Sequence, residues 1–283
     1  MLRRPYTEQT VSRLAVWARR VALFSLAATL IAVIIVRSGA LDIVPALSTL
    51  AGAVVLACVA ILLALGAGIV IWRDGIGGGR YAVTALLIGL ALIAYPLYLG
   101  IKAYRLPAIY DISTDPIDPP QFDAIARLRP RDANPVNYAG LYAAELQREA
   151  YADIEPDVTE ASPQDAYDAA LKVVTKRKWR VVDARPPQAA PPREGLIEAI
   201  ARTPILGFRD DVVVRVRAAP EGARIDIRSA SRYGRHDLGA NAARVRSLID
   251  DIDDALAAPA PDKKQPEAVK PAQAAGRGNS VKR

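Results

Sequence analysis

Three apolar runs within the first 105 residues constrain the fold of this chain more than any other sequence feature. The first run covers residues 21–36 and is extended upstream by residues 14–18, the second covers 43–72, and the third covers 81–101. The second and third runs contain no charged residue. A bilayer core about 30 Å thick needs about 20 apolar residues in helical form. The sequence therefore predicts a region of three transmembrane helices over residues 1–105.

The first run is the shortest, so a cleaved signal peptide is its alternative interpretation. No small-x-small cleavage pattern follows Val36, because the chain continues with Arg37-Ser38-Gly39 and soon becomes apolar again. The single cysteine, Cys58, lies inside the second run, so the chain cannot form an internal disulfide.

The distribution of Lys and Arg around these runs predicts their orientation. The N-terminal flank and the second loop carry seven basic residues, whereas the first loop and the end of the third run carry three. Because basic residues concentrate on the cytoplasmic side, we expect the N-terminus in the cytoplasm. Three crossings then place residues 102–283 on the opposite side, which is the periplasm in a Gram-negative cell. The expected location is the inner membrane, with the lipid bilayer as the first partner.

The net charge of +7 belongs to the membrane-proximal region. Residues 1–105 contain ten basic and three acidic residues, whereas residues 106–258 contain 21 basic and 25 acidic residues. A nucleic-acid-binding domain is expected to carry its excess positive charge on the soluble part. We therefore expect no nucleic-acid partner.

The remainder of the chain divides into three segments. Residues 106–160 begin with many Pro, Asp and Asn residues, which indicates an extended segment that wraps the domain, followed by a short helix over 138–150. Residues 161–258 carry periodic apolar patterns and are expected to form the soluble domain. Residues 259–283 are rich in Ala, Pro, Lys and Gln, which predicts a disordered tail.

The order of elements in residues 161–258 is helix, four strands, helix. Ser162 is a good N-cap, and Pro163 suits the first helical position. Strands are predicted over 178–184, 195–203, 211–217 and 223–231, and the last helix runs from near Asp237 to before Pro259. Short connections between consecutive strands favour an antiparallel sheet with both helices on its apolar face. The predicted fold is a membrane-anchored α+β domain of the helix-grip kind.

A two-residue turn at Glu221-Gly222 would fix the register of the last two strands. In that register Arg217 faces Asp226, which is a favourable pair, and Arg215 faces Arg228, which is not. Two like charges at opposed positions destabilise a sheet unless an acid or an anion lies nearby.

We therefore predict a binding surface for an anionic group such as a lipid headgroup, an acidic polysaccharide or an acidic segment of a partner. The alternative is that Glu198, or an acid of the wrapping segment, neutralises the arginines. The predicted site residues are Arg215, Arg228, Arg232 and Arg235.

No catalytic residue is predicted. A serine, a histidine and an aspartate that lie close in sequence have no nucleophile elbow around them, and a catalytic triad is defined by geometry rather than adjacency. His236 is interpreted as a turn residue and Asp237 as a helix cap. The neighbouring serines are Ser229 and Ser231.

No metal or cofactor is predicted either. One histidine and one cysteine within an apolar run cannot build a usual zinc site. The acidic pairs Asp210-Asp211, Asp250-Asp251 and Asp253-Asp254 could in principle bind a hard cation. We interpret them as solvated faces or strand starts.

Several stretches between about residues 106 and 257 carry a family resemblance. They are Asp111-Ile-Ser-Thr-Asp115 with Pro119-Pro120, Tyr138-Ala-Gly140, Ala150-Tyr-Ala-Asp-Ile154, Phe208-Arg-Asp-Asp-Val212, and Asp226-Ile-Arg-Ser-Ala-Ser-Arg232 with Leu238-Gly-Ala-Asn241. As a set they resemble the family called domain of unknown function 1499. The resemblance implies that this region is one unit, and it implies no activity.

The sequence favours a non-enzymatic binding or interaction domain held at the cell envelope. The main alternative is an envelope enzyme that acts on a phosphorylated or acidic substrate. A cleft with convergent, perturbed titratable groups would favour the enzyme, and a filled core under a basic sheet surface would favour binding. A third interpretation is a structural subunit of a membrane complex that packs through the small residues of the second apolar run.

Overall fold

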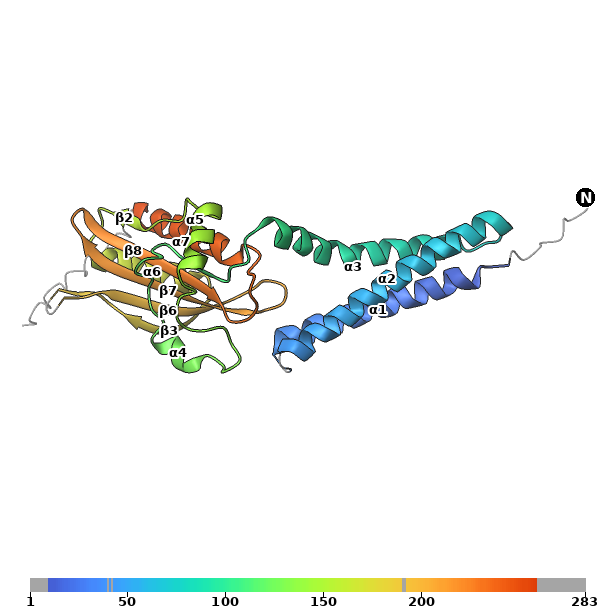
Figure 1. Cartoon of the computed structure of the whole chain (residues 1–283), viewed down its shortest axis with the longest axis horizontal. Helices are drawn as coiled ribbons and strands as arrows, with labels where there is room; N and C mark the ends of the chain where they lie inside the picture. Colours follow the sequence, from blue (N-terminus) through green and yellow to red (C-terminus); the bar gives the residue numbers. More distant parts are fainter. Residues whose placement is uncertain (1–9, 40, 42, 190–191, 259–283) are drawn as a thin grey trace, which may run out of the picture.

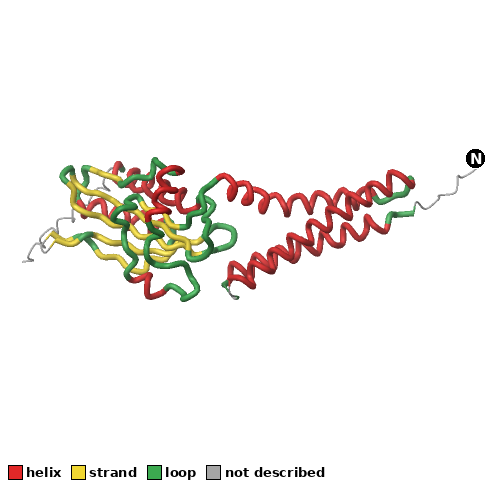
Figure 2. Tube along the Cα trace, in the orientation of Figure 1, coloured by secondary structure: helices red, strands yellow, loops and turns green. Residues whose placement is uncertain are grey.

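The computed structural model describes residues 10–39, 41, 43–189 and 192–258. Within these residues, three long helices lie at one end of the molecule and a sheet with its covering helices lies at the other (Figures 1 and 2). The prediction of a disordered tail over residues 259–283 falls outside the described residues.

The three long helices confirm the helices expected from the apolar runs. They are α1 (Arg13–Ser38), α2 (Ile43–Asp74) and α3 (Gly79–Arg105). Each is long and apolar enough to cross a membrane. Leu106 ends α3 in extended backbone, so the chain passes directly from the third helix into the domain.

Alanines make up most of the buried residues among the three helices. All the buried residues of α2 are alanines, and most of those of α1 are as well. Small side chains let helix backbones approach closely in a membrane. In α3 the buried residues are Ala82, Ala85 and Gly89, which all lie in its first half. Towards the domain α3 diverges from the other two helices (Figures 1 and 2).

The domain is built on a six-stranded antiparallel sheet. The central order is β3-β6-β7-β8, and two short strands, β1 and β2, pair with different parts of β8 along its outer edge. A separate two-stranded ribbon consists of β4 (Gln188–Ala189) and β5 (Pro192–Arg193). The strands of the sheet are β1 (Asp111–Ser113), β2 (Asp157–Thr159), β3 (Arg180–Arg185), β6 (Gly195–Arg202), β7 (Arg209–Ala219) and β8 (Gly222–Ser231).

The α+β prediction is confirmed, but the prediction of four strands is wrong. The four central strands match the predicted ones, and the two additional strands contain three residues each. Three residues are too few to display the alternation that identifies a strand. Contacts with distant residues stabilise such a short strand instead. In β1, the Gln147 side-chain amide donates to the Ser113 carbonyl at 2.7 Å and accepts the Ser113 N–H at 3.1 Å.

One face of the sheet is covered by helices, as the alternation of apolar residues along the strands predicts. α6 (Pro163–Lys176) and α7 (Ala240–Ala257) pack on it, and α5 (Leu141–Ala150) lies beside them (Figure 1). The Ser162 hydroxyl accepts the Asp165 N–H at 3.1 Å, which confirms the predicted N-cap. The buried strand residues of this face include Ile197, Val212, Val214, Val216, Ile225 and Ile227.

The second face of the sheet is partly covered by the segment that follows β1, and we call the whole of residues 106–137 the strap. The strap contains the short helix α4 (Ala124–Leu128). Phe122 and Ile125 of the strap form a small apolar cluster with Leu196, Ile200 and Val213 of the sheet. The strap therefore buries much of the second face, including the polar strand residues Glu198, Asp211, Asp226 and Arg228.

The predicted register of the last two strands is wrong by two residues. Ala219 pairs with Gly222, so Pro220 and Glu221 form the turn, and Arg215 faces Asp226 rather than Arg228. A two-residue shift keeps every side chain on its predicted face. Gly222 has a φ of 141°, and a Cβ there would lie 2.5 Å from the Thr159 carbonyl oxygen, so the close approach of the β2 end excludes a side chain at this position.

Two carboxyl groups meet where β2 approaches α7. Burial, and next the nearby Asp253 carboxylate, raise the pKa of Asp157 to about 6. This folded-state pKa lies above the ordinary value of 3.8, so protonated Asp157 stabilises the folded chain relative to the unfolded chain. That contribution to folding stability is complete below about pH 4 and is lost as the pH rises through about 6.

Asp157→Asn is therefore expected to stabilise the chain at pH 8 but not at pH 4. The gain should not exceed about 1 kcal/mol, because solvent screens a partly exposed pair. Chemical unfolding of both proteins at the two pH values measures it. An equal effect of the substitution at both pH values would contradict the raised pKa.

Candidate functional site

Among the predicted site residues, Arg228 lies wholly inside the domain. Its Nε and Nη2 donate to the two carboxylate oxygens of Asp111 at 2.9 and 2.8 Å, and both side chains are fully buried. The guanidinium also donates to the carbonyls of Pro120 and Val136 and lies over the ring of Phe122. An acid of the strap thus pairs with this arginine.

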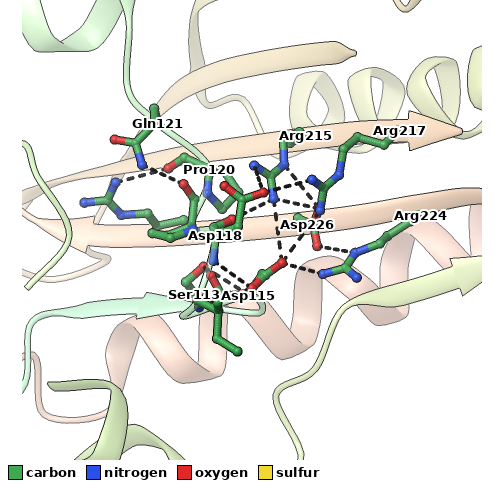
Figure 3. Close-up of polar contacts among 12 residues, drawn as sticks. Ser113, Asp115, Asp118, Pro120, Gln121, Arg215, Arg217, Arg224 and Asp226 are labelled. Carbon is green, nitrogen blue, oxygen red and sulfur yellow. Dashed lines mark hydrogen bonds and ion pairs between the residues drawn. The ribbon is translucent and has the colours of Figure 1, made fainter. Parts of the chain in front are cut away.

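A second ionic cluster surrounds Asp226 on the same face of the sheet (Figure 3). The Asp226 carboxylate accepts hydrogen bonds from Arg215, Arg217 and Arg224 at distances between 2.8 and 3.2 Å. From the strap, Asp118 pairs with Arg215 and Arg217, and Asp115 pairs with Arg224. Three arginines therefore meet three aspartates, and the predicted site residue Arg215 lies within this neutral cluster.

The other two predicted arginines lie elsewhere. Arg232 is buried, and its Nε and Nη2 donate to one carboxylate oxygen of Asp211, whose other oxygen accepts from Arg129. Arg235 is exposed and forms no ion pair with any residue in the described part of the chain. The four arginines are thus not gathered into one surface.

Glu198, the other suggested neutralising acid, has a different role. Its carboxylate is fully buried and accepts the backbone N–H groups of Asp123, Ala124 and Ile125 at 2.8 to 3.0 Å. At the start of a helix such as α4, these N–H groups have no acceptor within the helix. Glu198 therefore fastens the strap to β6, and its nearest basic group, Arg185, is 3.9 Å away.

The residues considered for nucleophilic catalysis point to different partners. The Ser229 hydroxyl donates to the Asn241 side chain, and the Asp237 carboxylate accepts the N–H groups of Gly239 and Asn241. His236 Nδ1 accepts the Leu238 N–H, so Nε2 carries the hydrogen and faces backbone carbonyls at the end of α3. Asp237 is thus a helix cap. Among the described residues, no group of three or more His, Cys, Asp or Glu is placed to hold a metal ion.

A cavity of about 330 Å³ lies on the second face of the sheet, next to the end of α4. Three neighbouring strands and the α6–β3 connection line it, and six of its nine lining residues are basic. We call it the basic pocket. Its lining residues are Leu128, Arg177, Lys178, Trp179, Arg180, Ile200, Arg202, Arg209 and Arg232.

Two of these cations are neutralised within the domain, and four are not. Arg177 pairs with Asp251 at 2.6 Å and lies over the ring of Trp179, and Arg232 pairs with Asp211. The remaining four are exposed, and their side chains form no ion pair or hydrogen bond with another residue that the structure describes. These four are Lys178, Arg180, Arg202 and Arg209.

Three of the unpaired cations occupy positions that cost stability. Arg202 of β6 lies directly opposite Arg209 of β7, and opposed like charges destabilise a sheet. Lys178 has a φ of 56°, in the left-handed region where a helix end usually has glycine. Strained and mutually repelling residues of this kind are concentrated at functional sites.

Of the residues that line this pocket, Arg232 alone was predicted from the sequence to be a site residue. The sequence signal nearest to the pocket is the run Lys176-Arg177-Lys178-Trp179-Arg180, whose basic residues also suit the C-terminal end of a helix. Arg202 and Arg209 flank the β6–β7 loop and are separated from that run by more than 20 residues. Only the strand order β3-β6-β7 brings the two groups together.

Comparisons with known proteins give a family and no activity. The sequence model for proteins of unknown function named DUF1499 matches residues 111–252, just over half of the chain, from the first residue of β1 into α7. No curated protein and no solved structure matches the chain. The matched region holds the whole six-stranded sheet and every residue of the basic pocket. The chain is therefore a member of the DUF1499 family.

Proposed function

We propose that this chain is a membrane-anchored binding protein whose basic pocket receives an anionic group, such as a phosphate or a carboxylate. One observation carries the proposal: four unpaired cations converge on a cavity that no carboxylate lines among the described residues. Arg guanidinium groups suit bidentate contacts with such oxyanions. An anionic ligand is also what we expected from the sequence. Of the four arginines that we expected to bind it, Arg232 lines this pocket.

The lining of the pocket supports binding rather than catalysis. Its described residues offer guanidinium, ammonium, indole and aliphatic groups. General acid–base catalysis near neutral pH usually uses an imidazole or a carboxyl group with an adjusted pKa. An envelope enzyme for phosphorylated or acidic substrates, the alternative from the sequence, therefore has less support from this site.

Trp179 provides a reporter inside the pocket. In a chain with Trp17→Phe and Trp72→Phe, it is the remaining tryptophan. With this chain in neutral nanodiscs, pyrophosphate is expected to change the Trp179 emission saturably. Arg202→Gln with Arg209→Gln should weaken this binding by about 100-fold, because each charged contact is worth about tenfold or more.

Arg193→Gln is the matched control, because Arg193 is exposed and lies on the β4–β5 ribbon, outside the pocket. This variant should bind pyrophosphate like the parent chain. Unchanged emission of the parent over the whole titration, or equal binding by the double variant, would refute the proposal.

Lys178→Gly separates binding from folding. Glycine relieves the left-handed backbone strain at this position but adds freedom to the unfolded chain. The stability of the variant should therefore lie within about 1 kcal/mol of the wild type. Its pyrophosphate affinity should fall, as measured by the same titration, and a variant that binds with full affinity would remove Lys178 from the site.

The proposed location is the inner membrane, with the N-terminus in the cytoplasm and the domain in the periplasm. The support is the basic-residue count, together with the backbone bridge between Val11 and Gly77, which places the two more basic ends side by side. An alkaline phosphatase fused after residue 283 is expected to be active. An active cytoplasmic reporter at the same position would reverse the orientation.

A further inference from the structure

The basic pocket lies at the end of the domain that meets the helices. The loop between β6 and β7 covers residues 203–208 and contacts the end of α1, where Arg37 Nη1 donates to the carbonyls of Pro204 and Ile205 at 2.5 and 3.2 Å. Arg202 and Arg209 are the residues on either side of this loop. The unpaired arginines are therefore held beside the end of a helix that is apolar enough to span a bilayer.

A second cavity shares Arg202, Arg209 and Arg232 with the pocket and is also lined by the helix ends. It has a volume of about 260 Å³, and one wall consists of the facing ends of α1 and α2, including Val36, Ile43 and Ala46. The other wall includes Arg202 and Arg209, which also line the basic pocket. Arg37, Asp132, Arg232 and Tyr233 also line the second cavity. The same two guanidinium groups thus border a cationic cavity and a cavity of mixed polarity that reaches apolar residues at the helix ends.

The surroundings of this junction are apolar on the side of the helices. The β6–β7 loop presents Ile205 with 46% of its surface exposed, and Phe208 of the same loop lines the second cavity. From the side of the helices, Ile43 and Leu41 line the same cavity, and Leu41 is 45% exposed. A molecule that binds here can therefore contact the two arginines of the domain and apolar side chains at the ends of α1 and α2.

We infer that the anionic group bound in the basic pocket is the phosphate of a phospholipid from the bilayer that anchors the chain. This inference rests on the proposed function and names its ligand class. The headgroup phosphate bridges Arg202 and Arg209, the remainder of the headgroup enters the basic pocket towards Lys178 and Arg180, and the glycerol end faces α1 and α2. A soluble phosphate has the same charged group but lacks the apolar part that would contact the ends of α1 and α2.

The test uses the chain with Trp17→Phe and Trp72→Phe, reconstituted into nanodiscs. One arm varies the phosphatidylglycerol content of a phosphatidylcholine bilayer, and the other adds soluble glycerol phosphate to a bilayer of phosphatidylcholine alone. We expect Trp179 emission to change with the phosphatidylglycerol content and to require far higher concentrations of glycerol phosphate. Arg202→Gln with Arg209→Gln should weaken the apparent affinity for phosphatidylglycerol by about 30-fold, since each basic residue near an anionic surface contributes about one further factor of five to six. Arg193→Gln should leave the response unchanged.

The outcomes distinguish this inference from the function on which it rests. A response to pyrophosphate or glycerol phosphate without any response to phosphatidylglycerol overturns the lipid inference and leaves the anion site intact. No response to any of these probes overturns both. As a second measurement, mass spectrometry of lipids retained after purification in mild detergent should find phospholipid bound to the parent chain and depleted from the double arginine variant. Equal retention by both proteins would contradict the assignment of Arg202 and Arg209.

Discussion

Replacing Asp111 with alanine should lower the free energy of unfolding by about 3–5 kcal/mol, because it leaves the fully buried Arg228 guanidinium without its counter-charge. The carbonyls that also accept from Arg228 cannot neutralise it. For a domain of this size the loss corresponds to a fall in Tm of about 10 °C. Thermal unfolding of the full chain in detergent, followed by near-ultraviolet circular dichroism, measures the shift.

Asp118→Ala is the matched control, because Asp118 also belongs to the strap and also pairs with arginines. Its side chain is 63% exposed, so its removal should cost no more than about 1 kcal/mol. Asp111→Ala with Arg228→Met should recover part of the stability lost by Asp111→Ala alone, since the unpaired charge is gone. A single Asp111 variant that melts with the wild type would contradict the role assigned to this pair.

Replacing Glu198 with alanine is expected to have an effect of similar size, about 3–5 kcal/mol. The substitution leaves the N–H groups of Asp123, Ala124 and Ile125 without their acceptor in a buried place. Because those groups begin α4, the strap should loosen there before the rest of the domain unfolds. Hydrogen exchange of the amides of residues 123–125 should therefore accelerate more than exchange in β7.

Glu194→Ala provides the comparison, since Glu194 is exposed and lies just before β6. Surface substitutions of this kind change stability by about 0.5 kcal/mol or less. Glu198→Gln retains one acceptor oxygen and should fall between the wild type and Glu198→Ala. Uniform acceleration of exchange across the sheet in Glu198→Ala would show that the carboxylate does not act locally on α4.

The parts of the fold that could be predicted are those with local signals. Ser162 and Pro163 mark the start of α6 through chemistry confined to four residues, and the valines of β7 identify its buried face without knowledge of its neighbours. The start of α7 was placed near Asp237, whereas the helix begins at Ala240 because the Asp237 carboxylate caps it from three residues upstream. The error in such a helix boundary is small because a capping signal acts within about one turn of the helix.

The parts that could not be predicted depend on contacts between distant segments. The β7–β8 turn differs from the expected one because the end of β2 approaches Gly222, and β2 itself is too short to be recognised. Two of the four arginines expected to attract an anion, Arg215 and Arg228, pair with acids of the strap, and no local pattern reveals the position of the strap over the sheet. The basic pocket requires the order β3-β6-β7, which no spacing in the sequence encodes.

The strap has a consequence for the order in which the chain can fold. Asp111 precedes its partner Arg228 by 117 residues, and Asp118 precedes Arg215 by 97. Contacts between such distant residues form late, since the intervening chain must first be brought together. During synthesis the acidic side of these pairs leaves the ribosome long before the basic side exists. The strap must therefore remain hydrated, fixed at one end by α3, until the β7–β8 hairpin has been translated and can pack against it.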